Sequence, residues 1–146
     1  MARRQLTGVL LVGGASRRFG SPKALARLNG KTLAEQAWGT LGEACDERLA
    51  FGKVADELDL PFPVDVPLAT PELVRALGEA CGEAAVPQTG PLPGAYARAA
   101  LALLERRLTA GELALRDALA ELATVTVELD LAQLVKVNAP EELARL

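Results

Sequence analysis

The residues of this chain that are best suited to chemistry follow an apolar run near the amino terminus. They form the pattern G-G-x-S-x-R-x-G-x-x-K, which consists of Gly13, Gly14, Ser16, Arg18, Gly20 and Lys23. Glycine lets backbone N–H groups approach a ligand closely, because no side chain stands in the way. A guanidinium can hold phosphate oxygens bidentately, and an ammonium acts as a point charge. The pattern therefore predicts a loop that binds a polyphosphate.

Two familiar glycine loops do not fit this pattern. A Walker A loop has the spacing G-x-x-x-x-G-K-[ST], whereas here Ser21 and Pro22 separate Gly20 from Lys23. A dinucleotide fingerprint has the spacing G-x-G-x-x-G, which the three glycines cannot supply. The loop therefore belongs to another type of nucleotide site.

The composition excludes several other kinds of site. The chain has 146 residues, a net charge of -3 and no histidine. The absence of histidine excludes imidazole metal sites. The two cysteines, Cys45 and Cys81, lie far apart, which excludes thiolate sites, so any metal must be bound by oxygen. Carboxylates, lysine, arginine and backbone amides remain, and these groups suit phosphoryl or nucleotidyl transfer.

Charge and hydropathy indicate which partners and which cellular compartment to expect. The negative net charge argues against a general nucleic-acid surface, since binding to a phosphate backbone needs a clustered basic face. No apolar run reaches the roughly 20 residues that span a bilayer, and the first residues do not resemble a cleaved leader. We therefore expect a cytoplasmic protein without nucleic-acid or membrane partners.

Strand and helix patterns alternate along the chain and predict the elements that position the loop. Residues 9–12 are a continuous apolar run, which predicts a strand buried on both faces of a parallel sheet. Asn29-Gly30 predicts a tight turn, and Thr32 to Glu35 read as a capping box that starts a helix. Further strands are predicted at 48–51, 61–64, 84–86, 125–129 and 134–137, and further helices from Thr70-Pro71, at 97–108, at 115–122 and from Ala139-Pro140. This order predicts one domain, a three-layer α/β/α sandwich with a mainly parallel, Rossmann-like sheet.

At the glycine loop the chain resembles the sugar-nucleotide-transferase-like nucleotidyltransferases, and among them the molybdenum cofactor guanylyltransferase family. Three more segments share this resemblance, in the family's order. Asp65-Val66-Pro67, with the helix start after it, is similar to the family's D-x-P metal motif. Residues 91–96 resemble the segment that lines the acceptor side, and residues 137–143 resemble the closing motif N-x-N-T-P-E-[DE]-L.

The resemblance implies an activity and a set of site residues. The family transfers GMP from GTP to the terminal phosphate of molybdopterin, forming molybdopterin guanine dinucleotide and releasing pyrophosphate. By this resemblance the catalytic residues are Arg18, Lys23 and Asp65, and the nucleotide-binding residues are Leu11, Val12, Gly13, Gly14, Ser16, Lys23 and Asp65. Asp65 is the expected ligand of Mg²⁺, and Asn138 is the expected contact of the acceptor. Small-molecule partners, GTP and molybdopterin, are expected, with transient contact to proteins that mature molybdoenzymes.

Several of these residues also have a purely structural interpretation. Ser16 contacts phosphate or satisfies the backbone of its own loop. Asp65 binds metal or caps the turn into the next helix, and its D-x-P context favours metal. Asn138 meets the acceptor or caps the last helix, and a cap alone is enough to explain an asparagine there. Trp38 lies on the apolar face of its helix, which indicates core packing.

The chain departs from the family between Phe51 and Asp65. Family members are longer by several tens of residues there, and the interval holds a further acidic residue, a G-P-L-x-G segment, a helix and a strand. Asp65 can therefore correspond to either of two family acids. Three interpretations remain open: a deletion that disables the enzyme, a compact active variant, or a sequence that lacks a stretch of the natural protein. The last is preferred, because the sequence on both sides keeps the family's character.

Two other functions compete with guanylyl transfer. The related cytidylyltransferase uses the same acceptor, but its pattern usually has alanine where this chain has Gly14, which favours guanine. A nucleotide-binding module without catalysis is the alternative from a different class. Separate measurements of GTP binding and pyrophosphate release distinguish these functions.

Overall fold

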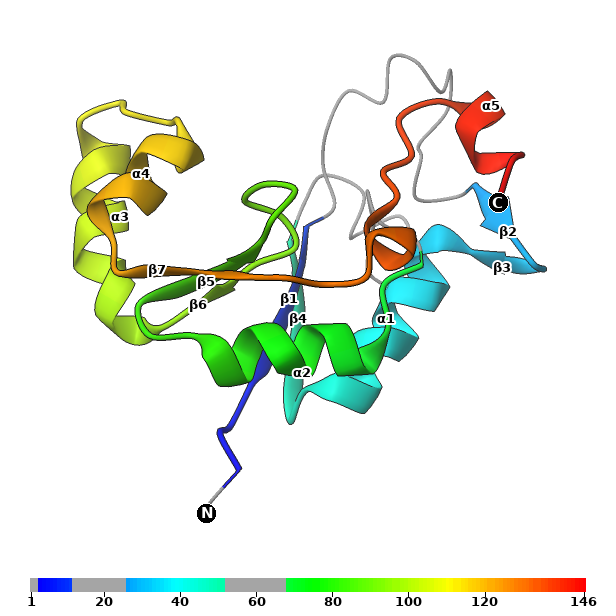
Figure 1. Cartoon of the computed structure of the whole chain (residues 1–146), viewed down its shortest axis with the longest axis horizontal. Helices are drawn as coiled ribbons and strands as arrows, with labels where there is room; N and C mark the ends of the chain where they lie inside the picture. The colour runs from blue at the N-terminus through cyan, green and yellow to red at the C-terminus, as the bar shows by residue number, and fades with distance from the viewer. Residues whose placement is uncertain (1–2, 12–25, 52–67) are drawn as a thin grey trace. The chain divides into compact units, whose positions relative to one another are not determined.

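The computed structural model describes residues 3–11, 26–51 and 68–146 (Figure 1). The chain divides into two compact units, which we call the first unit and the second unit. The first unit is Met1–Pro71 with Leu131–Leu146, and the second unit is Glu72–Asp130. Both contain helices together with a parallel pair of strands. The predicted mixed α/β class is therefore confirmed, while the strand predicted at 61–64 lies outside the described residues.

The first unit is built around a parallel pair of strands joined through a helix. Strand β1 (Thr7–Leu11) pairs with β4 (Glu47–Phe51), and α1 (Leu33–Ala44) lies between them in the sequence. Strands β2 (Arg27–Leu28) and β3 (Lys31–Thr32) form a hairpin ahead of α1. Its turn has positive φ at Asn29 (53°) and Gly30 (81°), so the predicted tight turn is confirmed.

Helix α1 begins with the predicted capping box. The Thr32 hydroxyl accepts the N–H of Glu35 at 3.1 Å, and the Glu35 carboxylate accepts the N–H of Thr32 at 2.6 Å. These bonds satisfy two donors that a helix start leaves unpaired. Trp38 is only half-buried, and the Arg48 guanidinium carbon lies 4.1 Å from the centre of its ring. Core packing therefore describes Trp38 only in part.

The expectation that β1 is buried on both faces is wrong. Gly8 and Leu10 are buried, whereas Val9 and Leu11 are 51% and 55% exposed. Helix α1 packs against the face that carries Gly8, where a Cβ would lie 3.0 Å from a methyl group of Leu41. Within the described part of the first unit, Val9 and Leu11 stay on an exposed face, so this apolar run has one buried side.

The second unit contains a three-stranded sheet with β5 (Ala84–Pro87) in the centre. Strand β7 (Thr124–Val127) pairs with β5 in parallel, and β6 (Ala95–Tyr96), which the sequence did not predict, pairs with it antiparallel. All four residues of β5 are buried. A buried cluster includes Ala84 of β5 together with Ala100 and Leu122. The side chains that pack against this cluster are those of Tyr96, Leu103, Leu104 and Leu119.

The helices of the second unit follow the sequence predictions closely. They are α2 (Pro71–Ala80), which begins in the first unit, the 3-10 turn η3 (Arg98–Ala100), α3 (Leu101–Thr109) and α4 (Leu115–Glu121). Gly111 follows α3 with a φ of 75°, a conformation that favours glycine. No helix in the described ranges is long and apolar enough to cross a membrane.

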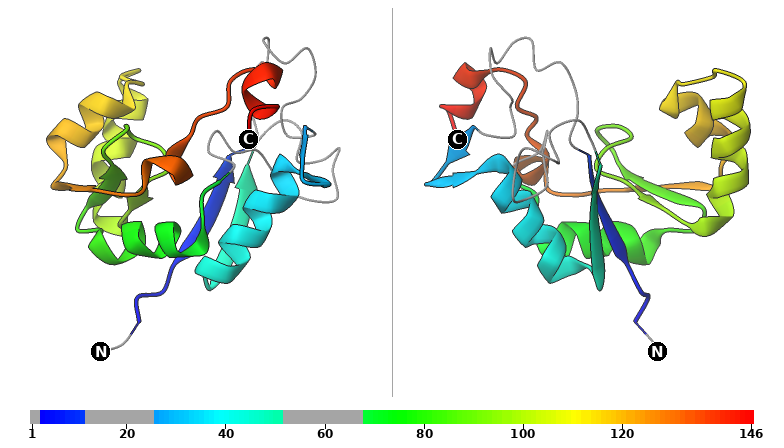
Figure 2. Two further views of the ribbon diagram at one scale, coloured as in Figure 1. Left: turned by 45° about the vertical axis from the view of Figure 1, so that its right-hand side comes forward. Right: turned by 180° about the vertical axis from the view of Figure 1, so that it is seen from behind.

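The end of the chain returns to the first unit, but without the strand predicted at 134–137. A 3-10 turn, η4 (Leu131–Leu134), leads into irregular chain and then α5 (Pro140–Leu143). Leu134 and Val137 are buried while Val135 and Lys136 are exposed, so burial there does not alternate as it does in a strand. Val137 packs with Leu28, Leu33 and Leu143, and Figure 2 shows α5 beside the β2–β3 hairpin.

Candidate nucleotide site

The structure describes the entry to the predicted nucleotide loop. Leu11 is the last residue of β1 and lies opposite Phe51 of the parallel strand β4. In open α/β sheets ligands bind beyond the carboxyl ends of the strands, so Leu11 stands at the edge where a nucleotide is expected. The other predicted residues lie outside the described part of the chain, namely Val12, Gly13, Gly14, Ser16, Arg18, Lys23 and Asp65. Their roles therefore remain predictions.

Strand β1 is fixed in place at its start. The Leu6 N–H donates to a carboxylate oxygen of Asp46 at 2.9 Å, and the Asp46 N–H donates back to the Leu6 carbonyl at 2.9 Å. The missing side chain of Gly8 then allows the close approach of α1, since a Cβ there would lie 3.1 Å from the Cys45 sulfur. The strand that leads to the glycine loop is thus held by two neighbouring elements.

The chain after the loop is anchored to the start of α1. The Leu33 N–H donates to the Ala26 carbonyl at 2.9 Å, and the Gln36 side-chain amide donates to the Leu28 carbonyl at 2.7 Å. The capping bonds from the backbone and side chain of Thr32 also hold the pKa of Glu35 below its ordinary value of 4.5. Strand β1, before the predicted loop, and the hairpin after it are therefore both held against α1 in the first unit.

Asn138 lies at the start of α5 but does not cap it. The N-cap is Ala139, and the Glu142 carboxylate accepts the backbone N–H of Asn138 at 2.6 Å and that of Ala139 at 3.2 Å. The exposed Asn138 is thus held through its backbone, and the interpretation of its side chain as the helix cap is wrong. The acceptor role remains a prediction.

A tightly held loop joins β5 to β6 in the second unit and includes the segment that resembles the family's acceptor side. The Gln88 carboxamide donates to the Leu129 carbonyl at 2.7 Å and accepts the Leu129 N–H at 3.1 Å. The Tyr96 hydroxyl donates to the Pro91 carbonyl at 3.1 Å. The shielded Thr89 hydroxyl has no hydrogen-bond partner in the described part of the protein. The sequence motif indicated the segment, but it did not indicate these contacts.

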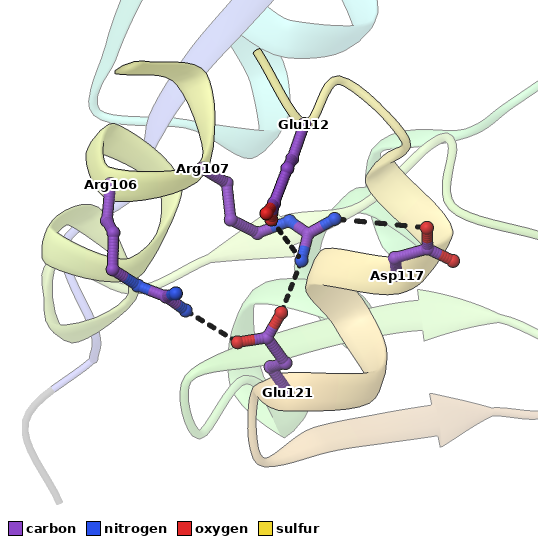
Figure 3. Close-up of polar contacts among 5 residues, drawn as sticks. All are labelled: Arg106, Arg107, Glu112, Asp117 and Glu121. Carbon is purple, nitrogen blue, oxygen red and sulfur yellow. Dashed lines mark hydrogen bonds and ion pairs between the residues drawn. The ribbon is translucent and has the colours of Figure 1, made fainter. Parts of the chain in front are cut away.

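Sequence reasoning missed an ionic cluster in the second unit. Arg107 is 7% exposed and lies among three carboxylates, with Glu112 at 3.1 Å, Asp117 at 3.9 Å and Glu121 in a short hydrogen bond (Figure 3). Arg106 contacts Glu121 as well, at 2.6 Å. These contacts tie α3 to α4. Because the partners lie 5 to 15 positions apart across a turn, helical spacing does not reveal them.

The described residues do not supply a metal site. Among them no group of three or more Cys, Asp or Glu side chains is placed to hold an ion. The Mg²⁺ prediction rests on Asp65, which lies outside the described ranges.

Comparison with known proteins identifies the family of the glycine loop. Residues 8–62 match the model of the MobA-like NTP transferase domain. A probable molybdenum cofactor guanylyltransferase from Chloroflexus aggregans is 29% identical over 190 residues, covering 94% of this chain and 91% of that protein. Just over a third of the chain is thus similar to the MobA-like NTP transferase domain. A second probable guanylyltransferase, from a Geobacillus strain, is 60% identical over 37 residues, which are 25% of this chain and 19% of that protein.

Solved structures confirm the fold of this chain. Molybdopterin-guanine dinucleotide biosynthesis protein A from Archaeoglobus fulgidus superposes with a TM-score of 0.77 at 22% identity, covering 96% of each chain. A mycobacterial protein from strain JC1 gives a TM-score of 0.62 at 22% identity, covering 95% of this chain and 93% of the other. These structures confirm the predicted nucleotidyltransferase fold, while the matched domain and the named relative support the expectation of an enzyme of the nucleotidyltransferase class.

The Chloroflexus relative is longer within the aligned region. The alignment runs over 190 positions, whereas this chain has 146 residues, so several tens of residues of the relative have no counterpart here. The relative is therefore longer than this chain within the aligned region, and the three interpretations of that difference remain open.

Proposed function

We propose that this protein transfers GMP from GTP to the terminal phosphate of molybdopterin and releases pyrophosphate. One observation carries the proposal: the chain aligns over 94% of its length with a probable molybdenum cofactor guanylyltransferase. The pattern from Gly13 to Lys23 supports it, because it lies inside the segment that matches the MobA-like domain and begins two residues after β1 ends.

The chemistry follows from the residue types in this loop. The terminal phosphate of molybdopterin attacks the α-phosphate of GTP in line, forming the new P–O bond as the bond to pyrophosphate breaks. Arg18 and Lys23 stabilise the negative charge that develops on the α-phosphate and on the leaving pyrophosphate. No covalent intermediate with the enzyme is needed, because positioning and charge stabilisation account for catalysis in related phosphoryl transfers. When bound by Asp65, Mg²⁺ adds further charge stabilisation.

A nucleotide-binding module without catalysis is the second candidate. The observation in its favour is length, since the chain lacks several tens of residues that the Chloroflexus relative has. Binding and turnover are therefore measured separately.

The first experiment is calorimetry with GTP and CTP, each with and without Mg²⁺. Binding of GTP that is stronger than binding of CTP, and that depends on Mg²⁺, supports the guanylyl assignment. Stronger binding of CTP supports the cytidylyl alternative. Absence of binding by both nucleotides contradicts the nucleotide site.

The second experiment is pyrophosphate release with GTP, Mg²⁺ and molybdopterin. Release that requires molybdopterin supports the transferase. GTP binding without release under the same conditions supports the module.

A further inference from the structure

The loop of residues 88–94 lies at the edge of the second-unit sheet where ligands are expected. Strands β5 and β7 run parallel, with Pro87 opposite Val127 as the last pair. The loop leaves the carboxyl end of β5, and in open α/β sheets ligands bind beyond that end. A binding loop needs a fixed shape, because ordering it on binding reduces affinity.

The side chain of Gln88 extends the pairing of β5 with β7 past the last backbone pair. Its amide nitrogen donates to the Leu129 carbonyl, and its carbonyl oxygen accepts the N–H of the same residue. A carboxamide offers one donor and one acceptor side by side, which matches these two backbone groups. A carboxylate of the same shape offers no donor, so at neutral pH a glutamate in place of Gln88 cannot make the bond to the Leu129 carbonyl.

The other end of the loop is fixed by Tyr96. Its hydroxyl donates to the Pro91 carbonyl, and its ring lies so close to Gly94 that a Cβ there would be 3.1 Å from a ring carbon. The same Cβ would lie 2.7 Å from the Pro91 carbonyl oxygen. Burial raises the pKa of the Tyr96 phenol, so the hydroxyl keeps the proton that it donates. Between the two ends, the Gly90 N–H donates to the Pro87 carbonyl at 3.2 Å.

We propose that Gln88 and Tyr96 are positioning residues, which hold the loop of residues 88–94 in the shape that binds the acceptor. This inference rests on the proposed function, under which molybdopterin is the acceptor. Neither side chain needs to touch the substrate. Each acts through a backbone group, Gln88 through Leu129 and Tyr96 through Pro91, so its loss weakens acceptor binding and leaves the bound nucleotide unaffected.

The kinetic test uses the full chain with the variants Gln88→Glu and Tyr96→Phe. With GTP saturating, the KM for molybdopterin is expected to rise about fivefold to tenfold in each, in line with the loss of one hydrogen bond. The KM for GTP should stay unchanged. Thr109→Val is the matched control, because it removes a side-chain donor from the Glu105 carbonyl in α3 of the same unit. An unchanged molybdopterin KM in both loop variants overturns the proposal.

A pH series separates positioning from a general loss of stability. In Gln88→Glu the new carboxyl faces the Leu129 carbonyl, so its protonated form restores the missing donor. The molybdopterin KM of this variant should recover toward the wild-type value as the pH falls from about 8 to about 5.5. Wild type and Tyr96→Phe should not show this recovery. A KM that stays high at every pH contradicts the role given to Gln88.

Hydrogen exchange tests the inference even if the chain does not turn over. The amides of residues 89–95 should exchange faster in Gln88→Glu than in wild type, while those of α3 and α4 keep their protection. Unchanged exchange in the loop overturns the positioning role. Absence of pyrophosphate release by wild type, with faster loop exchange in the variant, contradicts the proposed function alone.

Discussion

Strands β1 and β5 are both largely apolar and both pair in parallel with a neighbouring strand, yet they are buried differently. In β5 all four residues are buried, and neighbouring strands flank it on both sides. In β1 burial alternates, and Val9 and Leu11 remain about half exposed. The apolar composition of a strand therefore does not decide how many of its faces are covered. That depends on which other segments pack against it.

The two strands also differ in the evidence for function around them. The sequence after β1 carries a pattern of residue types within a segment that matches a known domain, whereas the loop after β5 carries contacts that fix its shape. The region after β1 is thus recognised from the types and spacing of its residues. The region after β5 is recognised from hydrogen bonds between residues that are distant in the sequence. The predictions below test this contrast, beginning with the largest expected effect.

Replacing Lys23 by alanine should abolish most of the activity that depends on the region after β1. We expect the rate of nucleotidyl transfer to fall by about 10²- to 10³-fold, because the charge that stabilises the leaving pyrophosphate is lost. Thermal unfolding should not change. The measurement is initial-rate pyrophosphate release with GTP and molybdopterin.

Lys31→Ala is the matched control for Lys23→Ala. Lys31 is an exposed lysine of β3 in the same unit, and its replacement should leave the rate within about twofold. Wild-type rates in Lys23→Ala would remove that lysine from the mechanism.

A pair of isosteric substitutions tests the burial contrast directly. Val86→Thr in β5 places a hydroxyl at a position that is 7% exposed, and should lower the free energy of unfolding by about 1–3 kcal/mol. Val9→Thr in β1 makes the same change at a position that is 51% exposed, and should stay within about 0.5 kcal/mol of wild type. Urea unfolding of the two variants measures both values. Equal costs would show that β1 is covered on both faces in solution.

The ionic cluster of the second unit should contribute a smaller share of stability. Arg107→Met removes the buried partner of Glu112, Asp117 and Glu121, and should lower the free energy of unfolding by about 1–2 kcal/mol. Arg106→Met removes an exposed arginine that contacts the same Glu121, and should cost less. Equal costs in urea unfolding would contradict the importance of burial at Arg107.

The cluster also predicts a dependence on pH. Hydrogen bonds from Arg106, and then from Arg107, hold the pKa of Glu121 below its ordinary value of 4.5. A carboxyl with a lowered pKa in the folded state stabilises the protein above its ordinary pKa, and this contribution is lost as the pH falls through the folded value. Wild type should therefore lose more stability below pH 4.5 than Arg107→Met does. Parallel acid unfolding curves would contradict this.

The smallest expected effect concerns the two helix starts of the first unit. Helix α1 has a complete capping box, whereas the N-cap of α5 is Ala139, which has no side-chain oxygen. Ala139→Ser adds an acceptor for the N–H of Glu142 and should raise the free energy of unfolding by about 0.5–1 kcal/mol. Thermal unfolding measures this change. A lower stability in the variant would show that the backbone at α5 does not admit a serine cap.

Much of the fold followed from patterns along the chain. The capping box at Thr32, the turn at Asn29 and Gly30, and the starts of α2 and α5 at prolines were all predicted. These features depend on bonds and side-chain periodicity within a few residues. The nucleotide loop is predicted in the same way, because its glycines and cations lie within eleven positions of each other.

The remaining features depend on contacts between distant residues. Gln88 contacts Leu129, 41 positions away, and strand β6 exists only because it pairs with β5. The open face of β1 and the burial of Arg107 likewise depend on what packs nearby. The sequence by itself determined many of the local elements and the resemblance to the MobA-like domain, and it predicts the phosphate loop, since each is a matter of residue type and short spacing. Only the tertiary structure decided which faces are covered and which side chains fix the loop after β5, because these depend on segments that meet across the fold.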